Sequence, residues 1–133
     1  MSRGAIKKYT LSSEERLKSR KKIQTLFAKG KVVNNPPIRI IYQWQKDDPL
    51  LQFGVAAGTR YFKKAVDRNR IKRLIREAYR LQKNELKACL IAQQKGLSLF
   101  IMYTGKTIPE YRFIYERIGE ILKKLEEESD ASA

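Results

Sequence analysis

The chain contains no histidine and only one cysteine, Cys89. Without histidine it lacks the side chain that most often serves as a general acid or base. A single cysteine can form neither an intrachain disulfide nor a cysteine cluster that holds a metal, and it fits a reducing cytoplasm. Acidic residues number only 14, whereas a metal site for phosphoryl transfer gathers several carboxylates. We therefore expect no catalytic side chain and no metal ligand in this protein.

Long hydrophobic runs are also missing. No stretch approaches the roughly 18 apolar residues that a membrane span needs, and the first residues lack the apolar core of a secretion signal, so we expect a cytoplasmic protein. Hydrophobic residues still make up 42% of the 133 residues, which argues against a disordered basic chain. The length predicts one domain, 1–133. Within it we expect a partly mobile basic arm at 1–18 and a disordered acidic tail at 126–133.

The hydrophobic patterns predict the order of the elements. They are a helix over 19–30 with Ser19 as N-cap and Gly30 as its end, strands over 38–44 and 50–57, and a helix within 63–80 that "NELKACLIAQQ" continues or follows. A strand over 97–104 and a helix from 109 complete the order. We expect the first two strands to form an antiparallel hairpin, and the 50–57 run can be one strand or two. The predicted fold class is α/β (α+β), a two-layer sandwich of order αββ(β)αβα with a mixed sheet and a βαβ crossover.

Positive charge dominates the composition and is concentrated in one stretch. There are 29 lysines and arginines, so the net charge is +15 and a polyanion is the expected partner. In "KKAVDRNRIKRLIREAYR", residues 63–80, eight cations stand against two acids, Asp67, the expected N-cap, and Glu77. The apolar residues of this stretch recur at helical spacing and predict a buried stripe: Ile71, Leu74, Ile75, Ala78 and Tyr79.

The cationic side of this helix favours nucleic acid over the alternatives. An ordinary solvated face carries mixed signs, because like charges one helical turn apart repel. Arginine exceeds lysine here, and its planar fork suits phosphate or a guanine edge. A membrane-surface helix would expose aromatic or leucine side chains beside the basic face, whereas this apolar stripe is needed for the core. We therefore predict a nucleic-acid-binding domain, with membrane binding the weaker alternative.

The segment "AVDRNRIKRLIREAYR" resembles the signature of the bacterial ribonuclease P protein component. The resemblance extends to "RKKIQTLFAKGK" at 20–31, the glycine of "FGVAA", and the strand and helix after Leu97. It implies a small basic subunit of a ribonucleoprotein whose RNA removes the 5′ leader from precursor tRNA. It also implies an α/β sandwich with a left-handed βαβ crossover, although connection rules favour the right-handed form.

The resemblance implies two sets of RNA-binding residues. The set that would bind the catalytic RNA is Lys63, Lys64, Arg68, Asn69, Arg70, Lys72, Arg73 and Arg76. The set that would bind the leader, in a cleft between the first helix and the sheet, is Ile23, Phe27, Arg39, Ile41 and Arg60.

Several of the leader residues have alternative interpretations. Helical spacing alone favours core packing for Ile23 and Phe27, whereas an aromatic at position 27 can stack on an unpaired base. The family usually has phenylalanine where this chain has Ile23. The strand register can present Tyr42 in place of Arg39 and Ile41. Thr59 and Arg60 replace two lysines of the family pattern.

The implied partners are ribonuclease P RNA and precursor tRNA, in a one-to-one complex with a protein monomer. We expect Mg²⁺ for the RNA-catalysed reaction, mainly on RNA phosphates and not on protein ligands, although the Asn69 amide oxygen is able to coordinate a cation. Two other functions remain open at this point. One is a generic RNA-binding or ribosomal protein, and the other is a nuclease that cuts RNA without an RNA partner.

Overall fold

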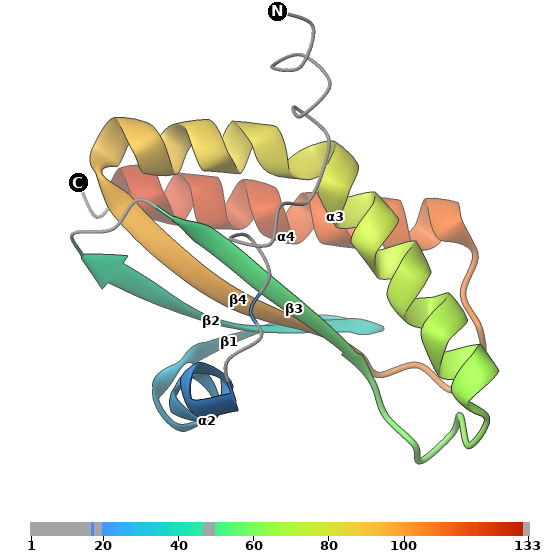
Figure 1. The fold of residues 1–133 in the computed structure, drawn as a ribbon. Coiled ribbons are helices and arrows are strands. Elements are labelled where there is room, and N and C mark those ends of the chain that lie inside the picture. Colours follow the sequence, from blue (N-terminus) through green and yellow to red (C-terminus); the bar gives the residue numbers. More distant parts are fainter. Residues whose placement is uncertain (1–16, 18–19, 47–49, 132–133) are drawn as a thin grey trace, which may run out of the picture.

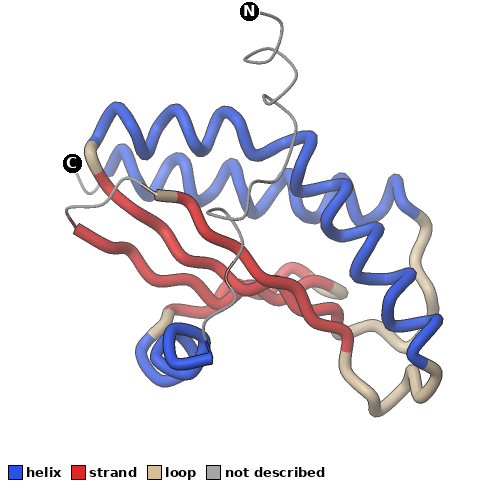
Figure 2. Tube along the Cα trace, in the orientation of Figure 1, coloured by secondary structure: helices blue, strands red, loops and turns tan. Residues whose placement is uncertain are grey.

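The computed structural model describes Leu17 and residues 20–46 and 50–131. The elements in chain order are α2 (Arg20–Lys29), β1 (Lys31–Asn35), β2 (Ile38–Lys46), β3 (Leu51–Ala57), α3 (Ala65–Gln93), β4 (Lys95–Tyr103) and α4 (Tyr111–Ala131). The strands form one mixed sheet of order β1-β2-β4-β3. Helices α3 and α4 cover one face and α2 lies on the other (Figures 1 and 2). The two main layers match the predicted sandwich, and α2 adds a partial third layer.

The predicted hairpin between the 38–44 and 50–57 strands, which are β2 and β3, is wrong. Strand β4 lies between them, antiparallel to β2 and parallel to β3. β2 instead forms its hairpin with β1 through a two-residue turn at Pro36 and Pro37. Strand β1 was not predicted, because "KVVNN" is a polar edge strand in which Val32 is exposed. Strand order depends on long-range packing that adjacent sequence patterns do not encode.

The connection from β3 to β4 is a left-handed crossover. In Figure 1, β3 lies in front of β4, and α3 runs above both strands as the chain returns from the end of β3 to the start of β4. Such connections are right-handed in the great majority of proteins. The arrangement therefore agrees with the expectation from the family resemblance and departs from the general rule.

The main core lies between the sheet and the two long helices. Four of the five predicted stripe residues of α3 are fully buried there, and Leu74 is half-buried. "NELKACLIAQQ" continues α3, which runs unbroken to Gln93. The helix begins at Ala65 with Lys64 as its N-cap residue, so Asp67 lies inside the first turn and is not the N-cap. A carboxylate in a first turn still interacts favourably with the helix dipole.

A second, smaller core lies under α2. Leu26 and Ile41 are buried in it together with Leu17, whose backbone N–H donates to the Phe53 carbonyl at 2.7 Å. Gly30 ends α2 as predicted, and a Cβ there would lie 2.5 Å from the Leu26 carbonyl oxygen. A side chain would therefore not fit. The predicted N-cap, Ser19, lies outside the described residues, and so does the predicted arm at 1–18 apart from Leu17.

The expected acidic tail is helical as far as Ala131, so the prediction of disorder from residue 126 is wrong over 126–131. The Glu128 carboxylate accepts hydrogen bonds from Tyr42 Oη at 2.7 Å, Trp44 Nε1 at 3.2 Å and Lys31 Nζ at 3.4 Å. Glu128, which was expected in the tail, thus links α4 to β1 and β2 through these hydrogen bonds. Residues 132–133 lie outside the described residues.

Candidate nucleic-acid interface

The register of β2 decides which of its side chains can reach a ligand beside α2. Ile38 and Ile40 belong to the main core, and so does Tyr42. Side chains alternate between the two faces of a strand, so Arg39 and Ile41 point to the α2 face. Arg39 is exposed, and its Nε donates to Asn34 Oδ1 at 2.9 Å. The register that would present Tyr42 to the cleft does not occur.

A groove of about 540 Å³ opens between α2, β3, β4 and α3. We call it the α2 groove; its lining is Leu17, Ile23, Phe53, Gly54, Val55, Arg76 and Phe100. Gly54 leaves room for the aromatic ring beside it, because a Cβ at this position would lie 2.7 Å from Phe100 Cδ1. Ile23 is half-buried and packs against the second core. Apolar surface from a helix and from the sheet therefore meets in one opening.

Phe27 stands beside this groove with much of its ring in solvent. Its side chain is 48% exposed, and the ring meets Phe100 edge to face with 5.3 Å between centroids. Core packing, which helical spacing favoured, therefore does not describe Phe27. Ile41, in contrast, is buried beneath α2 and only 7% exposed. It supports the site from below and does not reach into solvent.

The cationic face of α3 is largely open to solvent. It consists of Arg70, Lys72, Arg73 and Arg76, of which Lys72 is half-buried and the other three are exposed. Among the described residues none of these four forms an ion pair. Asn69, Lys63 and Lys64 are exposed next to this face. Unpaired like charges along one helix favour a polyanionic ligand.

Arg68 and Glu77 differ from the rest of the basic segment. Arg68 is half-buried, and its Nη1 donates to the carbonyl oxygens of Phe62 and Lys63, both at 2.8 Å. The guanidinium therefore braces the preceding loop and is not fully open to solvent. Glu77 pairs with Arg80, whose hydrogen bond holds the pKa of that carboxyl below its ordinary value. This acid is thus neutralised within its own helix.

Arg76 connects the two surfaces. It is an exposed member of the cationic face and also lines the α2 groove. From the sequence it was assigned to only one surface. Phe100 was not identified from the sequence, although alternation in "LSLFIMYT" places this residue on the face opposite Leu99 and Ile101, which are buried in the main core.

Arg60 lies apart from the other leader residues that the resemblance implied. It is exposed in the loop after β3, with its guanidinium carbon 5.5 Å from the centre of the Tyr61 ring. It does not line the α2 groove. Its cation is therefore separate from the apolar surface of that groove.

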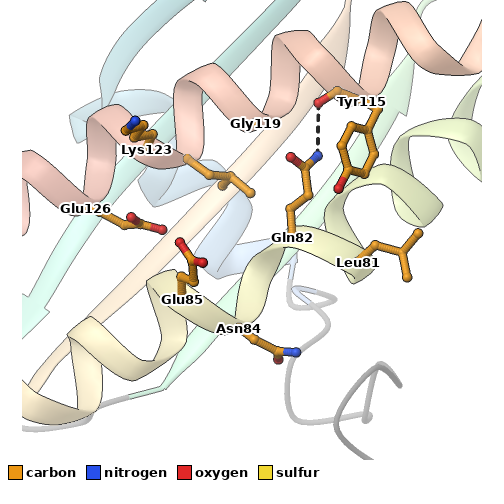
Figure 3. A pocket seen from close by; sticks show the side chains of 9 residues that line it. Leu81, Gln82, Asn84, Glu85, Tyr115, Gly119, Lys123 and Glu126 are labelled. Atoms are coloured by element: carbon orange, nitrogen blue, oxygen red, sulfur yellow. Dashed lines mark hydrogen bonds between the residues drawn. The ribbon is translucent and has the colours of Figure 1, made fainter.

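A second groove lies between the two long helices. A groove of about 460 Å³ between α3 and α4 is lined by Leu81, Gln82, Asn84, Glu85, Tyr115, Gly119, Leu122, Lys123 and Glu126 (Figure 3). We call it the acidic groove. Gln82 Nε2 donates to the Tyr115 carbonyl at 2.9 Å and ties the helices together. Its two carboxylates, Glu85 and Glu126, outnumber its one cation, Lys123, so the groove is a poor site for a nucleic-acid backbone.

Two further properties bear on the chemistry of the site. Within 20–46 and 50–131, no three residues of the ligand types His, Cys, Asp and Glu are grouped so that they could hold a metal ion. None of the helices in the described part of the chain is long and apolar enough to cross a membrane. The surfaces described so far therefore offer binding groups for a polyanion.

Known proteins with similar sequences agree on one family. The sequence profile of the Ribonuclease P family matches residues 11–125. The ribonuclease P protein component of Porphyromonas gingivalis W83 is 32% identical over 119 residues, which cover 88% of this chain and 87% of that protein. The ribonuclease P protein component of Syntrophus aciditrophicus is 36% identical over 120 residues, covering 90% and 93%.

Solved structures show the same fold. The Staphylococcus aureus RNase P protein superposes with a TM-score of 0.64 at 20% identity and covers 84% of this chain and 94% of its own. The Thermotoga maritima RNase P protein gives a TM-score of 0.63 at 24% identity, with coverage of 83% and 96%. The family that the sequence matches is that of a subunit of an endoribonuclease holoenzyme that matures the 5′ end of tRNA. The chain belongs to the bacterial ribonuclease P protein component family.

Proposed function

We propose that this subunit holds two RNAs side by side. The catalytic RNA binds the cationic face of α3, and the 5′ leader of precursor tRNA lies in the α2 groove. The observation that carries the proposal is the position of Arg76, which is exposed on α3 and also lines the groove. A single side chain therefore stands where the two RNAs would meet.

The cationic face acts by lowering repulsion between the two RNA backbones. Each lysine or arginine that neutralises a phosphate releases condensed counterions, which favours assembly. Hydrolysis is left to the RNA, because the chain has no histidine and its described residues gather no cluster of ligand side chains. These residues do not fit a protein-held Mg²⁺ site, so we assign the Mg²⁺ of the reaction to RNA phosphates.

The α2 groove suits a single strand better than a duplex. Exposed Phe27 and the Phe100 ring beside it offer aromatic surface on which unpaired bases can stack. Half-buried Ile23 adds apolar contact. A leader fixed in this way orients the precursor on the catalytic RNA, and orientation alone can contribute substantially to a rate.

The protein carries one such groove and one such helix face among its described residues, so we propose a one-to-one complex of a protein monomer with the catalytic RNA. We propose the cytoplasm as its location, where precursor tRNA would be encountered. The generic RNA-binding alternative is not favoured, because the matching family and relatives are those of this component.

The proposal is tested by cleavage of a precursor tRNA at low Mg²⁺ concentration. Three reactions are compared: the protein alone, ribonuclease P RNA from the same genome alone, and both together. Efficient release of the 5′ leader is expected only from the combination. The Arg76→Ala variant should lose much of the stimulation, whereas Lys123→Ala, an exposed cation of the acidic groove, should retain it. Cleavage by the protein alone, or equal effects of the two variants, would contradict the proposal.

A further inference from the structure

An exposed aromatic ring flanked by two cations lies outside both surfaces described above. The Tyr61 side chain is 45% exposed. The Arg60 guanidinium carbon lies 5.5 Å from its ring centre, and Lys106 Nζ lies 5.6 Å from the same centre. Among the described residues neither cation forms an ion pair. A tyrosine, a guanidinium and an ammonium group thus come together from two separate loops.

Both loops are braced from inside the protein. Next to Tyr61, Phe62 is buried and packs against Tyr103 with 5.9 Å between ring centres. Its carbonyl accepts one of the two Arg68 hydrogen bonds. On the other loop, Tyr103 Oη donates to the Thr107 carbonyl at 2.6 Å, next to Lys106. Bracing of this kind presents an exposed ring in a fixed position, which lowers the entropy that a ligand must remove.

The cluster lies at the start of α3 and away from α2. Figure 1 shows the loop after β3 beside the connection between β4 and α4, at the end of α3 where the helix begins. Lys63 and Lys64 follow directly in sequence and are exposed. Tyr61 does not line the α2 groove; it lines a shallow pocket of about 220 Å³ with Gly58, Arg60, Phe62, Tyr103, Thr104 and Gly105. The cluster therefore extends the surface assigned to the catalytic RNA and not the leader groove.

We propose that Tyr61, Arg60 and Lys106 form a stacking site for an unpaired nucleotide of the catalytic RNA. The base would lie on the exposed part of the Tyr61 ring, and the two cations would pair with the phosphates on either side of it. Stacking accepts every base, and the cations recognise the backbone, so the site selects an unstacked nucleotide and not a sequence. This inference rests on the proposed function, because it assigns a further contact to the same RNA partner.

The test is filter binding of the ribonuclease P RNA from the same genome at near-physiological salt, with full-length protein variants. Tyr61→Ala should weaken binding about 5- to 150-fold, the range expected for one stacked base. Tyr61→Phe keeps the ring and should stay within about twofold of wild type. Tyr115→Ala removes another tyrosine, 38% exposed in the acidic groove, and should not change affinity. Thermal unfolding of each variant confirms that the fold is intact.

A second measurement locates the nucleotide. Base-specific chemical probing of the RNA should show at least one unpaired base that wild-type protein and Tyr61→Phe protect and Tyr61→Ala does not. Arg60→Gln and Lys106→Gln should each reduce the salt dependence of binding by the contribution of about one phosphate contact.

The outcomes separate the inference from the proposed function. Unchanged affinity and unchanged protection in Tyr61→Ala, while Arg70→Ala binds more weakly, would overturn the stacking site and leave the RNA-binding function intact. Equal losses in Tyr61→Ala and Tyr61→Phe would assign the effect to the hydroxyl and also overturn it. If wild-type protein fails to bind the RNA, the proposed function itself fails.

Discussion

Arg68 combines a positive charge with a structural contact, and this distinguishes it from Arg70 two residues further along. Arg68 holds two loop carbonyls through Nη1, whereas Arg70 is exposed. We expect Arg68→Ala to lower the free energy of unfolding by about 1 to 3 kcal/mol, because hydrogen bonds from a charged group are lost. Arg70→Ala should leave stability unchanged, while both weaken RNA binding. Urea unfolding combined with filter binding measures this; equal unfolding midpoints for the two variants would show that the Arg68 contacts do not stabilise the loop.

Gly54 determines the shape of the α2 groove by lacking a side chain. A methyl group there would meet the Phe100 ring, which has to move. We expect Gly54→Ala to lower unfolding free energy by about 1 to 3 kcal/mol, as overpacking does, and to weaken binding of leader-containing precursor more than that of mature tRNA. Gly58→Ala is the matched control, because a Cβ at Gly58 would have no atom within 4 Å. Identical behaviour of the two variants would argue against a close-packed groove floor.

The Glu128 carboxyl makes the free energy of unfolding depend on pH. Burial alone would raise the pKa of its carboxyl, but hydrogen bonds from Tyr42, Trp44 and Lys31, with the charge of Lys31, outweigh burial and hold the pKa below its ordinary value of 4.5. A pKa that is depressed in the folded state stabilises the protein above the pKa of the unfolded chain. That contribution is lost as the pH falls below about 4.5 through the folded pKa.

The substitution Glu128→Gln measures this contribution. At neutral pH it should lower unfolding free energy by about 1 to 2 kcal/mol, a modest loss because the carboxylate is partly exposed. The difference from wild type should shrink as the pH is lowered toward 3 in chemical unfolding experiments. Glu127→Gln, a neighbour on the same helix, should behave as wild type throughout. A difference that stays constant with pH would rule out the charge as its cause.

At the scale of elements, α3 is a helix with an exposed cationic face and an apolar face that is buried in the core. Arg70 and Arg73 are exposed on it, so replacing either with glutamine should not disturb packing. We expect each substitution to reduce the slope of log affinity against log salt concentration by about 0.7 to 0.9, the contribution of one phosphate contact. Titrations of the catalytic RNA at several salt concentrations give the slope. A weaker affinity with an unchanged slope would mean that the arginine does not contact phosphate.

Local patterns predicted the elements better than their arrangement. The buried stripe of α3 followed from helical spacing alone, as did the end of α2 at Gly30. The hairpin prediction failed because β4, which is distant in sequence, inserts between the two strands. The left-handed crossover was expected only from the family resemblance, since general connection rules predict the opposite.

For the candidate site too, local sequence patterns predicted some features, whereas others depend on the tertiary fold. The charge pattern identified the cationic face, and Phe27 was expected at the cleft only through the resemblance, while spacing favoured the core. The Arg68 hydrogen bonds were not predictable, because their acceptors are loop carbonyls whose position depends on the tertiary fold. For the same reason nothing in the sequence indicated that Lys106 would come close to Tyr61.

At the scale of the whole molecule, charge is distributed unevenly over the surface. The cationic face, the α2 groove and the Tyr61 cluster are the surfaces that we propose bind RNA. The acidic groove between α3 and α4 carries Glu85 and Glu126 on the outer side of the two long helices (Figure 3). A net charge of +15 attracts RNA to the molecule as a whole. The uneven distribution favours one orientation on the polyanion.

The central claim is that the α2 groove holds the leader. It is tested most directly by the affinity of the reconstituted holoenzyme for precursor tRNA and for mature tRNA, measured with wild type, Phe27→Ala and Phe113→Ala. Phe113 is an exposed phenylalanine on α4 and serves as the matched control. We predict that Phe27→Ala weakens precursor binding about 5- to 150-fold and leaves mature tRNA binding unchanged, while Phe113→Ala changes neither. Equal losses for both tRNAs in Phe27→Ala would contradict the leader site and assign Phe27 to the packing of α2.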